Sequence, residues 1–272
     1  MAGSTLISSR IAEMILKISK NIIKLEAEAL IKLSDSLDNQ YSKALKILLN
    51  TKGTIFLSGV GKSGHIARKI ASTLTSTGTP AFFIHPTEAS HGDLGLLGKR
   101  DILLLLSNSG KSKELLDLLY YAKKNNICSL LITANFESKL SKMASHSIIL
   151  PNLAEVGKNN IAPTTSTTMM LALGDAIALS ISEIKKFPKS KFGEFHPGGN
   201  IGSRFLTVNN IMHTDQNIPL AKKDTSMKEV IIKISNKNFG CIGIINEINN
   251  LCGIITDGDL RRHMHKDLLK KK

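Results

Sequence analysis

The 272-residue sequence contains no tryptophan, and aromatic residues make up only 4% of it. Proteins that bind nucleic acids usually stack bases on aromatic side chains and concentrate their basic residues on one element. Here 36 lysines and arginines outnumber 22 acidic residues, but the surplus is spread along the chain. We therefore expect no nucleic-acid partner and a general preference for acidic or phosphorylated ligands.

Cysteine is scarce, and long apolar runs are missing. Cys128, Cys241 and Cys252 form no CxxC pair, and no Cys and His residues cluster with metal-ligand spacing. These cysteines lie in apolar runs and are predicted to be buried, reduced thiols of a cytoplasmic protein. No stretch approaches 18 uninterrupted apolar residues, and the N-terminus lacks the apolar segment of a signal peptide, so we expect no membrane partner.

The hydrophobic pattern predicts two helices followed by an α/β domain. Apolar residues recur at steps of three and four over residues 5–34, which indicates an amphipathic helix, and a second helix is expected at about 36–50, closed by Gly53. Apolar strands then alternate with helices, which indicates a parallel sheet with helices on both faces, as in flavodoxin or Rossmann-like three-layer folds. The predicted strands are 54–57, 81–84, 101–106, 128–133 and 147–150, and the predicted helices are 63–77, 112–125 and 162–184.

The pattern changes after Pro197-Gly-Gly199. A helix is predicted at 224–235, strands at 241–245 and 251–256, and a last helix at 257–268. Such a small α+β tail can hold little core by itself. We therefore divide the chain into N-terminal helices (1–50), a central α/β domain (51–208) and a C-terminal module (209–272).

Two loops at the carboxyl ends of predicted strands offer anion sites, because ligands of parallel sheets bind there. Hydroxyls and exposed N–H groups converge in Ser107-Asn-Ser-Gly-Lys-Ser112 at a helix start, which favours a phosphate, although the same residue types also form ordinary helix caps. Gly59-Val-Gly-Lys-Ser63 is not a P-loop, since that motif needs a glycine where Phe56 stands. Lys62 either contacts a phosphate or sugar oxygen or is a solvated lysine in a tight turn.

Other polar residues give weaker signals on their own. The segment from His85 to His91-Gly-Asp93 holds two histidines and two acids, which either bind a metal or, as we favour, make hydrogen bonds within the loop. Glu155 and His196 stand in loop-like stretches, where isolated polar residues are usually exposed.

Together these blocks resemble the arabinose-5-phosphate isomerase family, in which a sugar isomerase (SIS) domain is usually followed by a pair of CBS motifs. The resemblance spans about residues 10–268 and rests on several motifs in the same order. They are Gly59-Val-Gly-Lys-Ser-Gly-His65, Ser76-Thr-Gly-Thr-Pro80, His85-Pro…Glu88…His91-Gly-Asp-Leu-Gly95, Ser107-Asn-Ser-Gly110, Ala162-Pro-Thr-Thr-Ser-Thr-Thr168, Gly174-Asp-Ala176, His196-Pro-Gly-Gly199 and Asn210-Ile-Met-His213.

The resemblance implies interconversion of D-arabinose 5-phosphate and D-ribulose 5-phosphate, the reaction that starts synthesis of 3-deoxy-D-manno-octulosonate (Kdo) for lipopolysaccharide. It implies a homotetramer with active sites at subunit interfaces, no required cofactor, and inhibition by zinc. The family's catalytic residues map onto Lys62, Glu114, Glu155 and His196. Aldose–ketose isomerisation through an enediol needs a carboxylate base, here Glu155 or Glu114, and a group that stabilises the oxyanion, here Lys62. His196 is expected to open the sugar ring or to move the proton between O1 and O2, reaching in from a neighbouring subunit.

The same resemblance implies the residues that bind substrate. Gly78 and Thr79 are expected near the sugar, and His85 matches a position associated with zinc. The residues expected to hold the phosphate are Ser63, Ser107, Asn108, Ser109 and Ser112. The full set of substrate-binding residues is Ser63, Gly78, Thr79, His91, Ser107, Asn108, Ser109, Ser112, Thr165 and Ser166.

Two departures from the family pattern stand out. Lys111 replaces the usual glutamate of a Gly-Glu-Ser sequence, so it either tightens phosphate binding or disturbs the acid–base groups. Residues 210–266 match one CBS motif rather than two, so we expect it to pair with the motif of another subunit, around a nucleotide or sugar nucleotide, or to be a remnant without a ligand. Two alternatives to the isomerase remain: a non-catalytic sugar-phosphate sensor that regulates transcription, and an isomerase of heptose or hexosamine phosphates.

Overall fold

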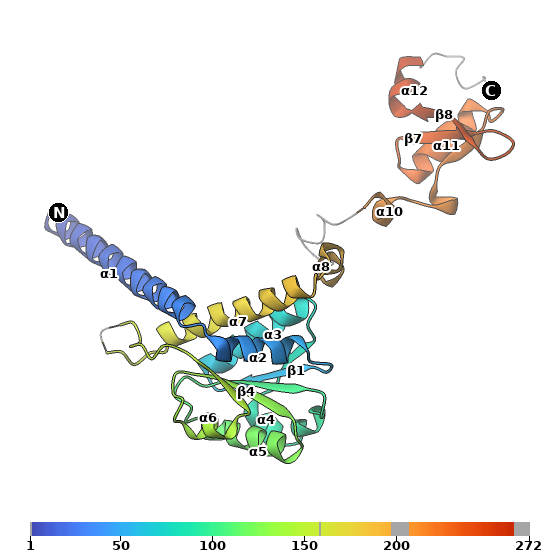
Figure 1. Ribbon diagram of the computed structural model, residues 1–272. Coiled ribbons are helices and arrows are strands. Elements are labelled where there is room, and N and C mark those ends of the chain that lie inside the picture. The colour runs from blue at the N-terminus through green and yellow to red at the C-terminus, as the bar shows by residue number, and fades with distance from the viewer. Residues whose placement is uncertain (1, 158, 197–206, 264–272) are drawn as a thin grey trace. The chain divides into compact units, whose positions relative to one another are not determined.

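The computed structural model describes residues 2–157, 159–196 and 207–263 (Figure 1). The chain divides into two compact units, Met1–Pro197 and Gly198–Lys272. Each unit has its own sheet and its own core, and each is described by itself.

The first unit is built on a five-stranded, fully parallel sheet of order β2-β1-β3-β4-β5. Leu104 of β3 pairs in register with Leu57 of β1 on one side and Leu130 of β4 on the other. Every residue of β1 and β3 is buried, which confirms the predicted α/β class. The strands are β1 (Ile55–Gly59), β2 (Ala81–Phe83), β3 (Ile102–Leu106), β4 (Cys128–Thr133) and β5 (His146–Ile149).

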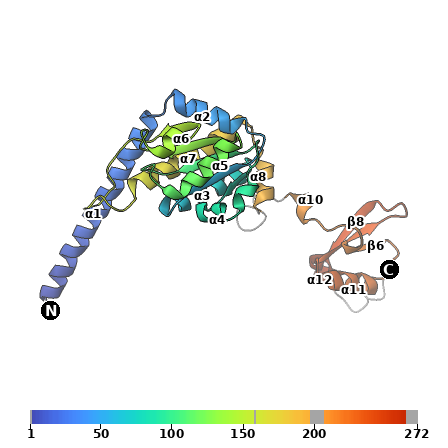
Figure 2. The ribbon, with the colours of Figure 1, turned by 90° about the horizontal axis from the view of Figure 1, so that it is seen from below.

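Helices cover both faces of this sheet, so the unit has three layers (Figures 1 and 2). Alternate strand residues face opposite layers: Leu104 and Leu106 belong to one core, Leu103 and Leu105 to the other. The first core is closed by α2 (Asn39–Leu49), α3 (Lys62–Ser76), α7 (Thr165–Ile184) and the end of α1 (Ala2–Asp35). The second is closed by α4 (Pro86–Ser90), α5 (Leu116–Lys124) and α6 (Lys139–Met143).

Helix α1 is anchored only near its C-terminal end. Ala29 and Leu33 are buried in the first core. Apolar residues nearer the N-terminus, such as Ile11 and Ile15, are about half exposed, and this part of α1 extends beyond the sheet in both views (Figures 1 and 2). The predicted amphipathic helix is confirmed, but half of its apolar stripe has no partner among the described residues of the chain.

The boundaries of α2 differ from the sequence prediction for local reasons. The helix starts at Asn39 rather than 36, because the Asp38 carboxylate accepts hydrogen bonds from the N–H groups of Gln40 and Tyr41. It ends at Leu49, with Asn50 as its cap, and not at Gly53. Gly53 is instead required by close packing, since a Cβ atom there would lie 2.5 Å from the carbonyl oxygen of Arg100.

Helix α7 is the one helix in the described ranges that is long and apolar enough to span a membrane, with a mean hydropathy of 1.3. Its position explains this composition. Gly174 lets it approach Ile70 of α3, and Lys69 pairs with Asp175 across the same contact. Its buried apolar side chains, from Met169 to Ile181, complete the first core, so α7 is a core helix.

The second unit contains a three-stranded sheet of order β6-β7-β8, in which β6 runs parallel and β8 antiparallel to β7. Among the residues of this unit that the structure describes, the buried apolar core consists of Ala221, Val230, Ile234 and Ile242. Its elements are β6 (Leu220–Lys222), α11 (Met227–Lys237), β7 (Cys241–Ile245), β8 (Leu251–Thr256) and α12 (Asp257–His263). The predicted extension of the last helix to 268 and the Pro-Gly-Gly residues 197–199 lie outside the described residues.

Several short elements were absent from the sequence prediction: β6, α4, α6 and α8 (Lys189–Phe195). None is longer than seven residues. Such segments are too short for a hydrophobic period to stand out.

The predicted burial of the three cysteines is wrong. Cys128 and Cys241 are half-buried, and Cys252 is exposed. An apolar run predicts a strand, but it does not show which of its side chains face the core.

Replacing Leu104 with alanine should lower the free energy of unfolding by about 2–5 kcal/mol, because the side chain is fully buried in the central strand. Chemical denaturation measures this change. Lys139→Ala, at an exposed position of α6, is the control and should change the free energy by no more than about 0.5 kcal/mol. Equal effects of the two substitutions would contradict the assigned core.

Candidate functional site

The parallel sheet gathers most of the predicted site residues at its carboxyl edge. Helix α3 begins at Lys62, just after β1, and Ser107 follows β3. Helices α3 and α7 run in the same direction, since Lys69 pairs with Asp175 and, further along both segments, Lys185 donates to Thr79. Both helix N-termini, which favour negative charge, therefore lie at this edge.

The loop Ser107–Ser112 is held tightly against β4. The carbonyl oxygen of Asn108 accepts hydrogen bonds from Ala134 N (3.0 Å) and from the Thr133 hydroxyl (3.0 Å). Gly110 has φ +63°, and a Cβ atom there would lie 2.0 Å from the Ser138 hydroxyl oxygen. Only glycine fits this position.

The serine hydroxyls of this loop lie close together. Ser107 is buried, and its hydroxyl oxygen lies 3.0 Å from that of Ser112. The N–H of Lys111 donates to the Ser109 hydroxyl at 3.3 Å. Ser63, in the first turn of α3, is half-buried at the same edge.

Glu155 is the best-positioned carboxylate of the predicted set. Its Oε2 accepts hydrogen bonds from the N–H groups of Thr164 (2.8 Å) and Ser166 (3.1 Å), and its Oε1 accepts from the Ser166 hydroxyl. Burial alone would raise the pKa of Glu155, but the hydrogen bonds from Ser166 and Thr164 outweigh it, so the pKa lies below its ordinary value. The carboxylate is thus ionised and oriented at neutral pH.

Two buried polar atoms have no hydrogen-bond partner in the described part of the chain: Asn108 Oδ1 and Thr165 Oγ1. Asn108 is in the loop Ser107–Ser112, which we call the serine loop, and Thr165 is the first residue of α7. Unsatisfied buried polar groups are rare in proteins, so each calls for a partner such as a ligand. Both were predicted to bind substrate, and both lie at the carboxyl edge.

The other catalytic candidates at this edge are exposed. Lys62 opens α3 after Gly61, whose φ is +57°. Glu114 lies in the 3₁₀ helix η2 (Lys113–Leu115), which follows the serine loop. Their roles stay predictions, since exposure is compatible both with catalysis and with a solvated surface.

The histidines around α4 form helix caps. His85 Nδ1 accepts a hydrogen bond from Thr87 N at 3.3 Å, and His91 follows the last residue of the helix. No group of three His, Cys, Asp or Glu side chains with metal-binding geometry occurs among the described residues. Substrate binding by His91 and zinc binding by His85 remain predictions.

Gly78, Thr79 and His196 lie apart from this cluster within one chain. The Thr77–Pro80 turn is at the amino edge of the sheet, because Pro80 O accepts from the N–H of Ile55, the first residue of β1. Gly78 has φ +89° and packs against Phe187. His196 stacks on Phe192 (4.3 Å between ring centroids) and lines a groove of about 850 Å³ beside α3 and β2, which also includes Gly78.

Glu155 lines a different hollow, of about 760 Å³, between α1 and residues 153–165. The two hollows share no lining residue in the described part of the chain. The chain therefore does not place His196 beside Glu155 in one pocket.

Comparison with known proteins identifies the family. Residues 47–180 match the SIS domain and residues 208–266 the CBS domain. Arabinose 5-phosphate isomerase KpsF of Escherichia coli O6:H1 is 45% identical over 244 residues, which are 89% of this chain and 74% of that protein. The chain belongs to the arabinose 5-phosphate isomerase family. Arabinose 5-phosphate isomerase KdsD of Yersinia pestis is 40% identical with the same coverage.

A solved structure supports the same family. The E. coli CFT073 protein c3406, in complex with arabinose 5-phosphate, superposes with a TM-score of 0.66 and 39% identity, and the match covers 68% of this chain and 98% of that one. The resemblance drawn from the sequence motifs is confirmed, as is the SIS-type fold. The assignment of individual site residues stays a prediction.

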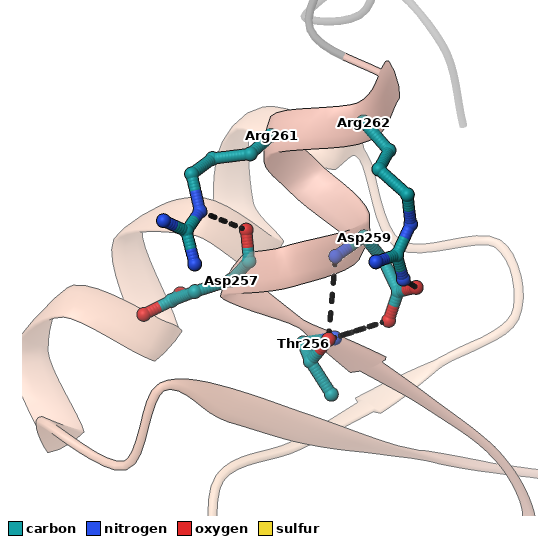
Figure 3. Close-up of polar contacts among 5 residues, drawn as sticks. All are labelled: Thr256, Asp257, Asp259, Arg261 and Arg262. Atoms are coloured by element: carbon teal, nitrogen blue, oxygen red, sulfur yellow. Dashed lines mark hydrogen bonds and ion pairs between the residues drawn. The ribbon is translucent and has the colours of Figure 1, made fainter.

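The CBS unit of this isomerase-family chain carries its own polar cluster (Figure 3). Asp259 accepts hydrogen bonds from the N–H (2.9 Å) and hydroxyl (2.7 Å) of Thr256, and Arg262 pairs with its other oxygen. The hydrogen bonds from Thr256, followed by that from Arg262, lower the pKa of Asp259 to about 2. The cluster fixes the junction between β8 and α12.

Ser166→Ala should raise the pKa of Glu155, because it removes the strongest hydrogen bond to the carboxylate and leaves the effect of burial. Carbon-13 NMR titration of the glutamate carboxyls measures this pKa. Thr167→Ala is the matched control, since the Thr167 hydroxyl bonds only to carbonyls of Pro163 and Thr164. A Glu155 titration that is the same in wild type and Ser166→Ala would contradict the assigned hydrogen bond.

Asp259→Asn should weaken the protection of α12 amides against hydrogen exchange in the full chain at pH 7. Because the pKa of Asp259 is lower in the folded than in the unfolded chain, its carboxylate stabilises the fold at pH values above 3.8, the pKa in the unfolded chain. This contribution is lost as the pH falls toward 2. Asp257→Asn removes the same charge from the first turn of α12 but none of these bonds, so it should have the smaller effect. Equal loss of protection in both variants would refute the role of the Thr256–Asp259–Arg262 cluster.

Proposed function

We propose that this chain interconverts D-arabinose 5-phosphate and D-ribulose 5-phosphate through an enediol intermediate and so feeds Kdo and lipopolysaccharide synthesis. The observation that carries the proposal is an oriented, ionised carboxylate, Glu155, at the same sheet edge as the serine loop. The names of the relatives, two isomerases of arabinose 5-phosphate and a structure in complex with that sugar phosphate, support the same substrate.

The reaction moves a proton from C2 of the aldose to C1 of the ketose. An ionised carboxylate removes the C2 proton, and the resulting enediolate is reprotonated at C1. Glu155 suits this step because four hydrogen bonds from Thr164 and Ser166 hold it ionised and fix its direction; Glu114 is the alternative base. Lys62, beside the N-terminus of α3, stabilises the oxyanion that develops on the carbonyl oxygen. The serine loop anchors the phosphate and so positions the reacting carbons.

A second copy of the chain completes the site in this proposal. His196 and Glu155 line separate hollows in one chain, so His196 of a neighbouring subunit supplies ring opening or proton transfer between O1 and O2. The exposed apolar stripe of α1 and the small core formed by the described residues of the CBS unit support an oligomer, with a homotetramer expected. In this assembly CBS motifs pair between subunits around a nucleotide or sugar nucleotide.

The proposed enzyme is cytoplasmic and requires no cofactor. Zinc acts only as an inhibitor, with His85 as one ligand. A carboxylate base and an ammonium group supply the proton transfer and the charge stabilisation that this isomerisation needs.

Turnover of D-arabinose 5-phosphate in the presence of EDTA tests the proposal. Wild-type protein should form ribulose 5-phosphate, and His196→Ala should lose most of this activity while keeping its fold. In deuterated water, Glu155→Gln should also stop exchange of the C2 proton, whereas Glu114→Gln should retain it if Glu155 is the base. Absence of turnover in well-folded wild-type protein would refute the proposed substrate, and exchange that survives in both variants would refute a carboxylate base.

A further inference from the structure

The serine loop carries a lysine whose role the fold does not explain. Lys111 lies between Gly110 and Ser112, and its side chain is exposed. It makes no ion pair or side-chain hydrogen bond with any described residue. Its backbone is nevertheless fixed, because Gly110 is locked against Ser138 and the N–H of Lys111 donates to the Ser109 hydroxyl.

The loop around Lys111 bonds its backbone carbonyl oxygens internally and leaves backbone N–H donors available. The carbonyl oxygens of Ser107, Asn108 and Ser109 accept hydrogen bonds from Gly110 N, from Ala134 N and the Thr133 hydroxyl, and from Asn135 Nδ2. The N–H groups of Asn108 and Ser109 have no acceptor within the described ranges. A loop with bonded carbonyls and free N–H groups is suited to an anion.

A phosphate bound in the serine loop needs a nearby positive charge to balance its own negative charge. A phosphate monoester carries close to two negative charges at neutral pH. Glu114, in η2 directly after the loop, adds a negative charge that opposes binding of this anion. Lys62, on a different loop, is assigned to the oxyanion. The serine loop itself contributes one charged side chain, Lys111.

We propose that the ammonium group of Lys111 binds the phosphate group of the substrate and so sets affinity rather than the rate of proton transfer. This inference rests on the proposed function for the identity of the substrate, but phosphate binding itself is measurable without turnover. Lys111 acts through charge-assisted hydrogen bonds, which a neutral polar side chain cannot replace.

The test compares Lys111→Gln with Lys113→Gln, an equal loss of charge at an exposed position two residues away. Inorganic phosphate is titrated against the full chain, and its apparent Kd is taken from the rise in thermal stability. KM and kcat for D-arabinose 5-phosphate are measured in parallel. We expect Lys111→Gln to raise both Kd and KM about tenfold with kcat unchanged, the loss typical of one charged hydrogen bond. Lys113→Gln should stay within about twofold of wild type, and Lys111→Arg should restore binding.

The outcomes separate this inference from the proposed function. Turnover with a KM and phosphate Kd that are the same in wild type and Lys111→Gln refutes the inference and keeps the function. Phosphate binding that depends on Lys111, without turnover of D-arabinose 5-phosphate, keeps the inference and refutes the function. A lower kcat with unchanged KM would place Lys111 with the acid–base groups and overturn the proposal, as would wild-type protein that does not bind inorganic phosphate.

Discussion

The parallel pairing of β1, β3 and β4 is the constraint on which the rest of the first unit depends. Parallel strands must return through crossovers, so each strand is followed by a loop and then by a helix on one face. Every such loop after a carboxyl end opens at the same edge. The serine loop, the start of α3 at Lys62 and the start of α7 at Thr165 therefore lie at one edge of the sheet because of the topology, although they are far apart in the sequence.

Because the strands are buried, polar atoms just beyond their carboxyl ends are buried too, and those without hydrogen-bond partners cost free energy. Just beyond β3, Ser107 is almost fully buried, and Asn108 and Thr165 keep buried polar atoms without partners among the described residues. A buried polar atom without a partner costs free energy, and the hydroxyl groups of a bound sugar phosphate would satisfy both atoms. Glu155 is treated differently, since Thr164 and Ser166 supply the donors that keep it ionised without a ligand. The carboxylate of the site is thus oriented before substrate binds. The unpartnered polar atoms lie where substrate hydroxyls are expected.

Much of this arrangement could be predicted from the sequence because it rests on strong local patterns. Strands β4, β7 and β8 have the predicted bounds, and the serine and Gly59–Ser63 loops follow strands as expected. The start of α2 at Asn39 depends on one side chain, Asp38, and a hydrophobic period cannot show it. The hydrogen bonds that orient Glu155 could not be predicted either, because they join residues 155 and 164–166 through a loop whose shape no periodicity specifies. The motif Ala162–Thr168 marked that segment, but not which hydroxyl would reach the carboxylate.

The separation of Glu155 from His196 follows from the direction of α7. A helix that starts at the carboxyl edge and spans the sheet must end at the amino edge, where Lys185 meets Thr79 and the chain continues into α8. His196, which follows α8, therefore lies far along the sheet from Glu155 in the loop before α7, although the proposed reaction needs both residues. Bringing His196 to Glu155 within one chain would require α8 to cross back over the first core, which α1, α2 and α3 already cover. Association of copies is the geometric alternative, and it would at the same time bury the apolar residues of α1 that this fold leaves exposed.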